Sequence, residues 1–199
     1  QIRHVGDIVK VDNGAIVNFI SGFAQAEYTG GNVSAFVGGT VSGTWYRRED
    51  RYNYVRDISS EWVSKPGVDI KAGINYNINE FHNVYLNGGY FSLAPYFKFV
   101  FGNYNNIPTR DLNNEKVRSG ELGYGFYRAG TRLRLNAYIA QWKDKSVLTN
   151  EYNQFEDPVM LQGLDALHQG VELEVSQRLA GWISLNGMLS LGDWKWKNN

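Results

Sequence analysis

Residues 68–79 constrain the fold of this chain most, because their apolar and polar side chains alternate without interruption. Val68, Ile70 and Ala72 begin one set, and Asp69 and Lys71 begin the other. A period of two residues predicts a β-strand with one apolar and one polar face. An ordinary globular strand has about five or six residues, whereas a strand that crosses a bilayer needs about 9–11. The stretch is therefore typical of a membrane-crossing strand, with a long strand of a soluble sheet as the alternative.

The same alternation predicts about eight long strands along the chain. They are expected at residues 16–28, 33–46, 68–79, 84–93, 117–127, 131–142, 171–176 and 183–191. Short turns alternate with three long connections at residues 47–66, 94–115 and 143–167. Outer-membrane barrels have short periplasmic turns and long extracellular loops. We therefore expect an all-β fold, an antiparallel transmembrane β-barrel segment.

Each expected strand has one face whose central part lacks Lys, Arg, Asp and Glu. An Arg or Lys that faces lipid at mid-bilayer costs about 2–4 kcal/mol, so charge is excluded there. The residues expected to face lipid are Val33, Val37, Val68, Ile70, Ala72, Ile74, Leu133, Leu135, Ile139, Val171, Leu173, Leu185 and Leu189.

Composition narrows the functional classes. Twenty basic and twenty acidic residues give a formal net charge of zero, which argues against a nucleic-acid-binding protein. Cysteine is absent, so disulfides and thiolate metal sites are excluded. No run of apolar residues is long enough for a membrane-spanning helix. Aromatic residues make up 15% of the chain and glycines number 22, a bias typical of barrels with aromatic girdles.

Five segments carry a family resemblance. They are Phe-Ala-Gln-Ala-Glu-Tyr at 23–28, Gly-Ile-Asn-Tyr-Asn-Ile-Asn at 73–79, Gly-Gly-Tyr-Phe-Ser with Ala-Pro at 88–95, Asn-Glu-Lys through Glu-Leu-Gly-Tyr at 114–124, and Gln-Gly-Val-Glu-Leu-Glu at 169–174. In this order and spacing they resemble the barrel of TonB-dependent receptors of the Bacteroidetes type. Asn114 stands where that family commonly has a proline.

The resemblance implies that residues 1–199 are the middle-to-late part of a receptor barrel without its plug domain. The implied function is import of a siderophore, glycan, peptide or cobalamin across the Gram-negative outer membrane. The implied partners are the lipid bilayer, a TonB complex acting through a plug, and a surface lipoprotein. Two alternatives remain open from the residues: a self-closed eight-stranded barrel with a structural or adhesive role, and a soluble barrel or sandwich that binds a small ligand.

No catalytic motif, metal site or cofactor site is expected, because the zinc-protease, nucleophile-elbow and phosphate-loop patterns are missing. Aromatic side chains in the long connections are candidate substrate contacts, with loop packing and an interfacial girdle as the alternative. The candidates are Trp62, Tyr96, Phe97, Phe99 and Tyr104.

A second set of candidates lies on two neighbouring strands. Arg132 and Arg134 alternate with apolar residues, as do Glu172 and Glu174. Both pairs begin or end near a short turn, so we expect all four on one polar face. Opposite charges on adjacent strands favour a structural charge ladder on the lumen wall, although paired carboxylates also suit acid–base chemistry.

Overall fold

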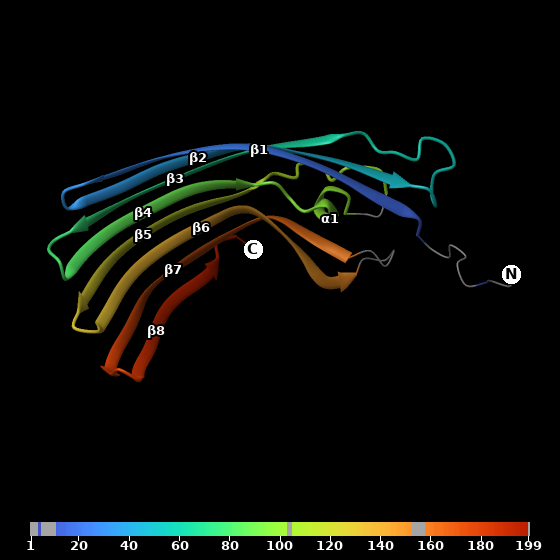
Figure 1. Ribbon diagram of the computed structural model, residues 1–199. Coiled ribbons are helices and arrows are strands. Elements are labelled where there is room, and N and C mark those ends of the chain that lie inside the picture. The colour runs from blue at the N-terminus through green and yellow to red at the C-terminus, as the bar shows by residue number, and fades with distance from the viewer. Residues whose placement is uncertain (1–3, 5–10, 103–104, 153–157, 199) are drawn as a thin grey trace.

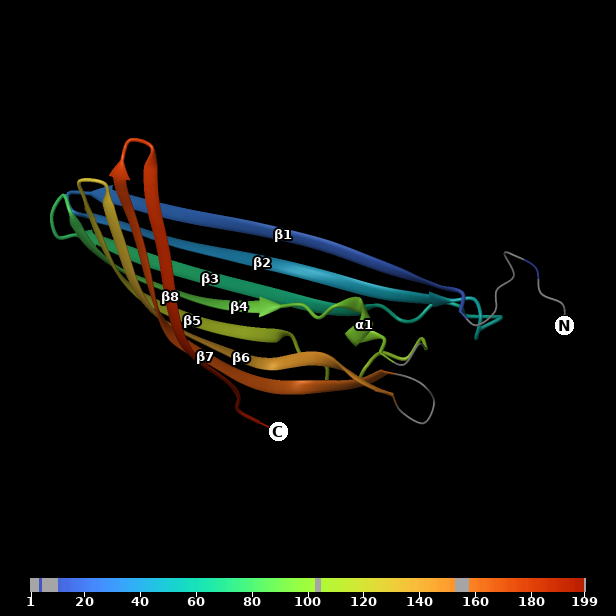
Figure 2. The same cartoon turned by 90° about the horizontal axis from the view of Figure 1, so that it is seen from below.

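The computed structural model describes residues 4, 11–102, 105–152 and 158–198, which form one sheet and one short helix. The strands are β1 (Asn13–Gly30), β2 (Val33–Asp50), β3 (Val63–Asn77), β4 (His82–Leu93), β5 (Glu115–Arg128), β6 (Thr131–Tyr152), β7 (Pro158–Ala180) and β8 (Ile183–Trp196), and the helix is α1 (Phe97–Val100). Figures 1 and 2 show the strands bending together as a trough, with the short turns at one end and α1 at the other. No helix of this described part is long and apolar enough to cross a membrane.

Every strand pairs antiparallel with the next strand in sequence, in the order β1 to β8. The all-β antiparallel prediction is therefore confirmed. Within the described ranges, β1 and β8 are not paired with each other. The sheet is accordingly open, with a free edge on each of these two strands.

The register assigns each side chain to one of two faces, because residues directly opposite each other point the same way. Val37 lies opposite Ala72, and Ala72 lies opposite Gly88. Continuing this rule across the sheet puts all thirteen residues expected to face lipid on one side, which we call the apolar face. They cover little of one another: Ile70 is 53% exposed and Leu185 is 59% exposed. The sheet leaves this apolar face without a covering layer.

The charge-free part of the apolar face forms a band that crosses the sheet obliquely. Its border at the loop end lies at Arg47 on β2 and at Asp193 on β8. Following the paired residues back from Asp193 leads through Gln169 and Ile139 to Val37, ten residues before Arg47. With a rise of about 3.3 Å per residue and strands about 4.8 Å apart, that displacement over six strand pairs corresponds to a tilt of roughly 50°.

The short-turn end steps in the same direction. Val33, the first residue of β2, is connected rung by rung to Leu189, six residues into β8. This shift corresponds to a tilt of roughly 35° by the same spacings. The second value equals the lower limit of the 35–45° tilt of barrel strands, and the first is slightly above the upper limit. The apolar band therefore has the slant of a barrel wall.

Several strand boundaries differ from the sequence-based prediction. β2 continues to Asp50 and β3 starts at Val63, so the first long connection is shorter than expected. The long loop expected at residues 143–167 is wrong, because β6 and β7 stay paired through most of it, with bulges after Trp142. The eighth strand, expected at residues 183–191, is also longer than predicted, since β8 continues to Trp196. Beyond the apolar band, strands can pair without alternating apolar and polar side chains, so the sequence pattern did not predict pairing there.

Pairing between β3 and β4 stops earlier than pairing elsewhere in the sheet. It ends at Ile70 opposite Tyr90, although both strands continue. Side chains bridge the gap: Asp69 accepts a hydrogen bond from the Ser92 backbone N–H at 3.0 Å, and Asn114 Nδ2 donates to the Pro66 carbonyl at 2.7 Å. We call this side-chain-bridged stretch the β3–β4 seam.

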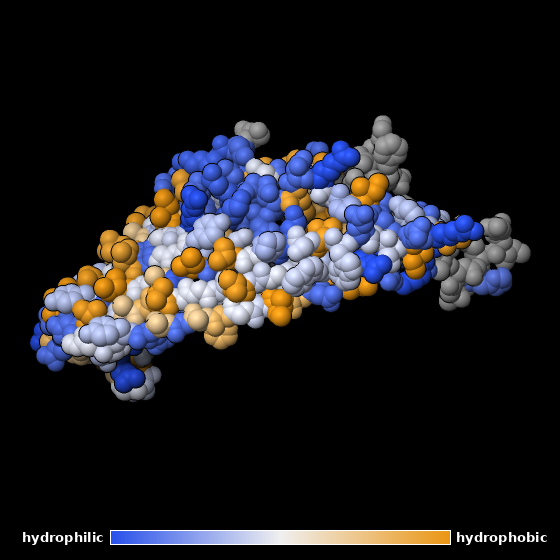
Figure 3. Space-filling view, turned by 90° about the horizontal axis from the view of Figure 1, so that it is seen from above, coloured by the Kyte–Doolittle hydropathy of each residue, from blue (hydrophilic) through white to orange (hydrophobic). Residues whose placement is uncertain are grey.

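Figure 3, seen from the β1 side, shows hydrophobic residues concentrated toward the short turns and hydrophilic residues toward the loops. The opposite, polar face carries side chains such as Glu27, Lys71 and Asn87, and these line hollows. Because hollows form on the inner side of a curved sheet, the polar face is the concave one.

Candidate ligand-binding cavity

The connection between β4 and β5 folds back over the concave face and forms the only buried apolar cluster of the described residues. Tyr46 from β2 packs there with Phe99, Val100, Phe101 and Leu112, each at most 7% exposed. The Tyr46 hydroxyl donates to the Pro95 carbonyl at 2.6 Å. The backbone N–H of Phe99 bonds to the Tyr96 carbonyl at 2.8 Å, which starts the single turn of α1. Aromatic residues thus fix this connection against the sheet.

A cavity of about 770 Å³ lies between this connection and the concave face. Its apolar wall comes from Val17 and Phe19 of β1, Tyr46 of β2, and Leu93 through Phe99, while Glu115, Asp144, Lys145 and Ser146 form a polar wall. This volume lies in the range of small-molecule sites, which are typically apolar with a few polar groups. The cavity can therefore hold a ligand with an aromatic or apolar part and polar substituents.

The charges at the polar wall are mutually compensated. Lys145 Nζ lies 3.0 Å from Glu115 Oε1, and Lys116 Nζ lies 2.8 Å from Asp144 Oδ2. Lys98 lies over the ring of Phe99, with Nζ 5.2 Å from its centroid. Cations and anions alternate, so the wall offers hydrogen bonds without a strong preference for one sign of ligand charge. Within the described part of the chain, no three His, Asp or Glu side chains are grouped closely enough to bind a metal ion.

The structure brings three of the five candidate substrate contacts to this cavity. Tyr96, Phe97 and Phe99 all line it, and Tyr96 is 76% exposed whereas Phe99 is buried. Trp62 is not brought to it: its ring lies against Arg47, with the guanidinium carbon 5.6 Å from the centroid. Arg47 is on the apolar-face side of β2, so Trp62 belongs to the outside of the sheet. Tyr104 lies outside the described residues.

The four charged candidates on β6 and β7 share the polar face. Arg134 lies directly opposite Glu174, with Nη1 3.6 Å from Oε2. Arg132 instead lies over the ring of Tyr127, and Glu172 accepts a 3.4 Å hydrogen bond from Ser190 Oγ. Both members of the Arg134–Glu174 pair are about half exposed, so the pair is worth at most about 1 kcal/mol. The arrangement is one exposed ion pair with two flanking charges rather than a continuous ladder.

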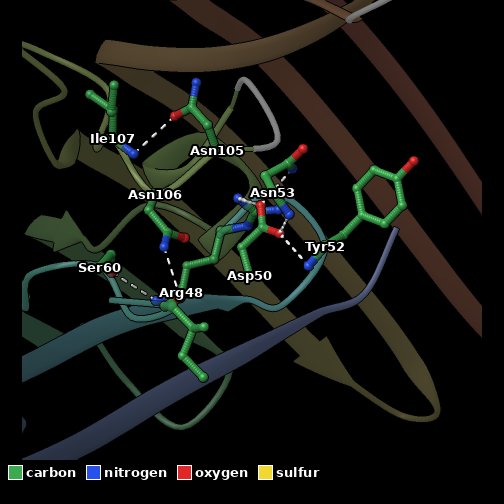
Figure 4. A network of polar contacts seen from close by, with 9 residues as sticks. Arg48, Asp50, Tyr52, Asn53, Ser60, Asn105, Asn106 and Ile107 are labelled. Carbon is green, nitrogen blue, oxygen red and sulfur yellow. Dashed lines mark hydrogen bonds and ion pairs between the residues drawn. The ribbon is translucent and has the colours of Figure 1, made fainter. Parts of the chain in front are cut away.

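A buried ion pair at the loop end of β2 was not among the sequence-based candidates. Arg48 and Asp50 are 3% and 1% exposed, and Arg48 Nη1 lies 3.1 Å from Asp50 Oδ2 (Figure 4). Asp50 Oδ1 also accepts the backbone N–H groups of Tyr52 and Asn53 at 3.0 and 2.9 Å. The sequence showed only a charged run at these positions, because nothing in it indicated that a later loop would cover them.

Two further segments meet at this ion pair. Ser60 Oγ accepts a hydrogen bond from the Arg48 backbone N–H at 2.9 Å. Asn106, from the connection after α1, donates to the Ile58 carbonyl at 2.8 Å (Figure 4). The pair and these contacts, which we call the loop clamp, join the β2–β3 and β4–β5 connections at the loop end of the sheet. Burial alone would raise the pKa of Asp50, but hydrogen bonds from Asn53 and Tyr52 and the charge of Arg48 hold it below its usual value.

The loop clamp predicts a strong effect of Asp50→Asn. This change leaves the Arg48 guanidinium buried without its counter-charge, which costs about 3–5 kcal/mol. We expect faster hydrogen–deuterium exchange at residues 51–60 and 105–107. Asp57→Asn is the matched control, because Asp57 is an exposed carboxylate of the same connection and asparagine tolerates its positive φ of 53°. Equal exchange in the two variants would contradict the clamp.

The same pair predicts a pH dependence. Since the folded pKa of Asp50 is lowered, its stabilising contribution is complete above the unfolded value of about 3.9. That contribution is lost as the pH falls through the lower folded pKa. Protection of residues 51–60 should therefore drop below about pH 4 in the native protein and not in the Asp50→Asn variant.

The fold is similar to part of several solved structures. The copper transporter OprC matches 91% of this chain and 29% of its own, with a TM-score of 0.72 and 12% identity. The FrpB iron transporter from Neisseria meningitidis matches 94% of this chain and 27% of its own, with a TM-score of 0.70 and 14% identity. The siderophore receptor PirA from Pseudomonas aeruginosa matches 92% of this chain and 44% of its own, with a TM-score of 0.61 and 13% identity.

No protein-family model matches the sequence, and no curated protein is similar to it. The chain spans less than half the length of each solved structure named above. At these identities the likeness concerns the fold. The chain thus has the fold of part of the β-sheet of these transport proteins.

Proposed function

We propose that this chain is part of the barrel wall of a TonB-dependent receptor in the Gram-negative outer membrane. The observation that carries this proposal is the charge-free band, which crosses all eight strands on one exposed face at the slant of a barrel wall. A water-facing surface has no reason to exclude charge in this way. A lipid-facing surface does, because each buried charge costs free energy that depends on its depth.

The open edges support a larger ring than eight strands. Hydrocarbon offers no partner for unpaired backbone N–H and C=O groups, so barrels that span membranes are closed. A self-closed eight-stranded barrel, the alternative from the sequence, would need a ladder between β1 and β8, and none joins their described residues. We therefore infer that further strands pair with both edges. A soluble barrel would have to cover the apolar face, and this sheet does not do so.

The substrate class follows from the family rather than from the cavity. We infer import of a large or scarce nutrient, namely a siderophore, glycan, peptide or cobalamin, with energy from a TonB complex through a plug domain. A surface lipoprotein is a further partner that this proposal includes. The solved structures of similar fold are named for copper, iron and siderophore transport, so metal chelates are tested first. The mixed polarity of the cavity wall is compatible with such ligands.

Membrane placement predicts a difference between two neighbouring positions on β8. Leu189 lies on the apolar face opposite Leu173, and Met188 lies on the polar face opposite Glu174. Both are well exposed, at 58% and 64%. Leu189→Arg should lower the free energy of unfolding in phospholipid bilayers by about 2 kcal/mol or more. Met188→Arg should change it little, and equal effects would show that the apolar face does not meet lipid.

Transport predicts that uptake depends on the TonB complex. The protein is expressed in a Gram-negative host that lacks its own chelate receptors, with and without a functional TonB complex. We expect growth on one member of a panel of ferric chelates, copper complexes, glycans, peptides and cobalamin only when TonB is present. Growth on none of them, or growth independent of TonB, would contradict the proposed function.

The cavity predicts which aromatic residue matters for binding that substrate. Tyr96→Ala should weaken affinity about three- to tenfold, the range for losing one aromatic contact. Trp62→Ala removes another exposed aromatic ring, which lies outside the sheet, and should leave affinity unchanged. The dissociation constants of both variants are measured by fluorescence titration. A larger loss for Trp62→Ala would move the binding site away from the cavity.

A further inference from the structure

Three cations lie together where the apolar band ends on β5 and β6. Lys116 and Arg118 are on the apolar-face side of β5, and Lys143 is on the same side of β6. Arg118 and Lys143 are exposed. We call these three residues the border cation cluster. They are the first charges met on leaving the band along these two strands.

The register holds these cations close together. Lys116 lies directly opposite Lys143, and Arg118 lies opposite Gln141. Arg118 and Lys143 are thus diagonal neighbours, about 7–8 Å apart at their Cα atoms in an antiparallel pair. Like charges directly opposite each other destabilise a sheet. The arrangement needs a compensating negative charge on this face.

The described part of the chain supplies only part of that charge. Asp144 Oδ2 accepts from Lys116 Nζ at 2.8 Å, which compensates one cation. Among the described residues, Arg118 and Lys143 have no carboxylate within ion-pair distance. The cluster therefore presents about two uncompensated positive charges next to the apolar band.

The neighbours of the cluster match a membrane interface rather than open water. Tyr90 lies directly opposite Arg118 on the same face, and tyrosine favours the headgroup level of a bilayer. Toward the short turns, the next residue of β5 on this face after Gly120 is Leu122, which is 59% exposed. Long cationic side chains at such a border extend along the apolar surface and put their charge at the headgroups.

We propose that Arg118 and Lys143 bind the phosphate of a membrane-lipid headgroup, with Tyr90 beside it. An Arg fork and a Lys point charge together suit a phosphate group. The acyl chains of the same lipid would lie along the apolar band below. This inference rests on the membrane placement in the proposed function but is independent of the transported substrate.

The test compares lipids that differ only in the headgroup. The protein is placed in bilayer discs of phosphatidylcholine with a minority of phosphatidic acid that has the same acyl chains. After mild detergent extraction, native mass spectrometry measures which lipid stays bound. We expect the native protein to retain phosphatidic acid in preference to phosphatidylcholine.

The Arg118→Gln/Lys143→Gln variant should lose this preference by at least about tenfold, since each cation near an anionic surface strengthens binding severalfold. Arg56→Gln/Arg110→Gln is the matched control, because both arginines are exposed in the loops and the change in charge is the same. That control should retain phosphatidic acid as the native protein does. An equal loss in the control would overturn the inference, because total charge would then explain the binding.

Two further outcomes separate the explanations. Displacement of the lipid by inorganic phosphate would overturn the inference and mark the cluster as a site for the free ion. A protein that enters the discs without preferring phosphatidic acid overturns this inference alone. A protein that enters no disc overturns the membrane placement and this inference together.

Discussion

Backbone hydrogen bonding between neighbouring strands is the interaction on which this structure depends. Apart from the cluster around Tyr46, the described side chains form no buried core, so the sheet is not held by packing against a second layer. The register of the strands determines which side chains share a face, as a core does in a globular domain. A shift of one residue in the pairing of a strand would move all its apolar residues to the polar face. The long hairpins with their tight turns, such as Gly30 to Val33, fix that register.

The loop end is organised by a different interaction. There the strands extend beyond the apolar band, and their side chains pack against the connections instead of being exposed. The Tyr46 cluster and the loop clamp both anchor on β2, four residues apart at Tyr46 and Asp50. One strand thus positions two connections, and the cavity lies between one of them, the β4–β5 connection, and the sheet. The polar face is concave, and the ligand-sized space forms there beside the place where β3–β4 pairing stops and where β6 bulges.

The alternation of side chains was enough to predict the strand count, the antiparallel order and the shared apolar face, whereas the open edges were implied by the family resemblance. It was enough because each strand within the band obeys the same two-residue rule, as at residues 68–79. The rule stops at the band border, which explains the errors at β2, β6 and β7. The candidate site was predicted only in part for the same reason. Tyr96, Phe97 and Phe99 are adjacent in sequence, but the contribution of Val17 and Phe19 depends on a fold-back that no local pattern encodes. Trp62 is adjacent to Val63 in the sequence, but the two residues lie on opposite faces of the sheet. Its position next to a strand therefore did not bring Trp62 to the cavity.

The β3–β4 seam has a mechanical consequence. A sheet under load parts where the fewest backbone hydrogen bonds resist, and here that place lies between β3 and β4 at the loop end. There the side chains of Asp69 and Asn114 each make one hydrogen bond across the β3–β4 seam, and water can replace either bond once the strands separate. Strands β1–β3 and β4–β8 are therefore joined by backbone pairing near the short turns, but near the loops by side-chain contacts: these two hydrogen bonds, the Tyr46 cluster and the loop clamp. Loss of those side-chain contacts would let the mouth of the trough widen, whereas its base would keep its shape.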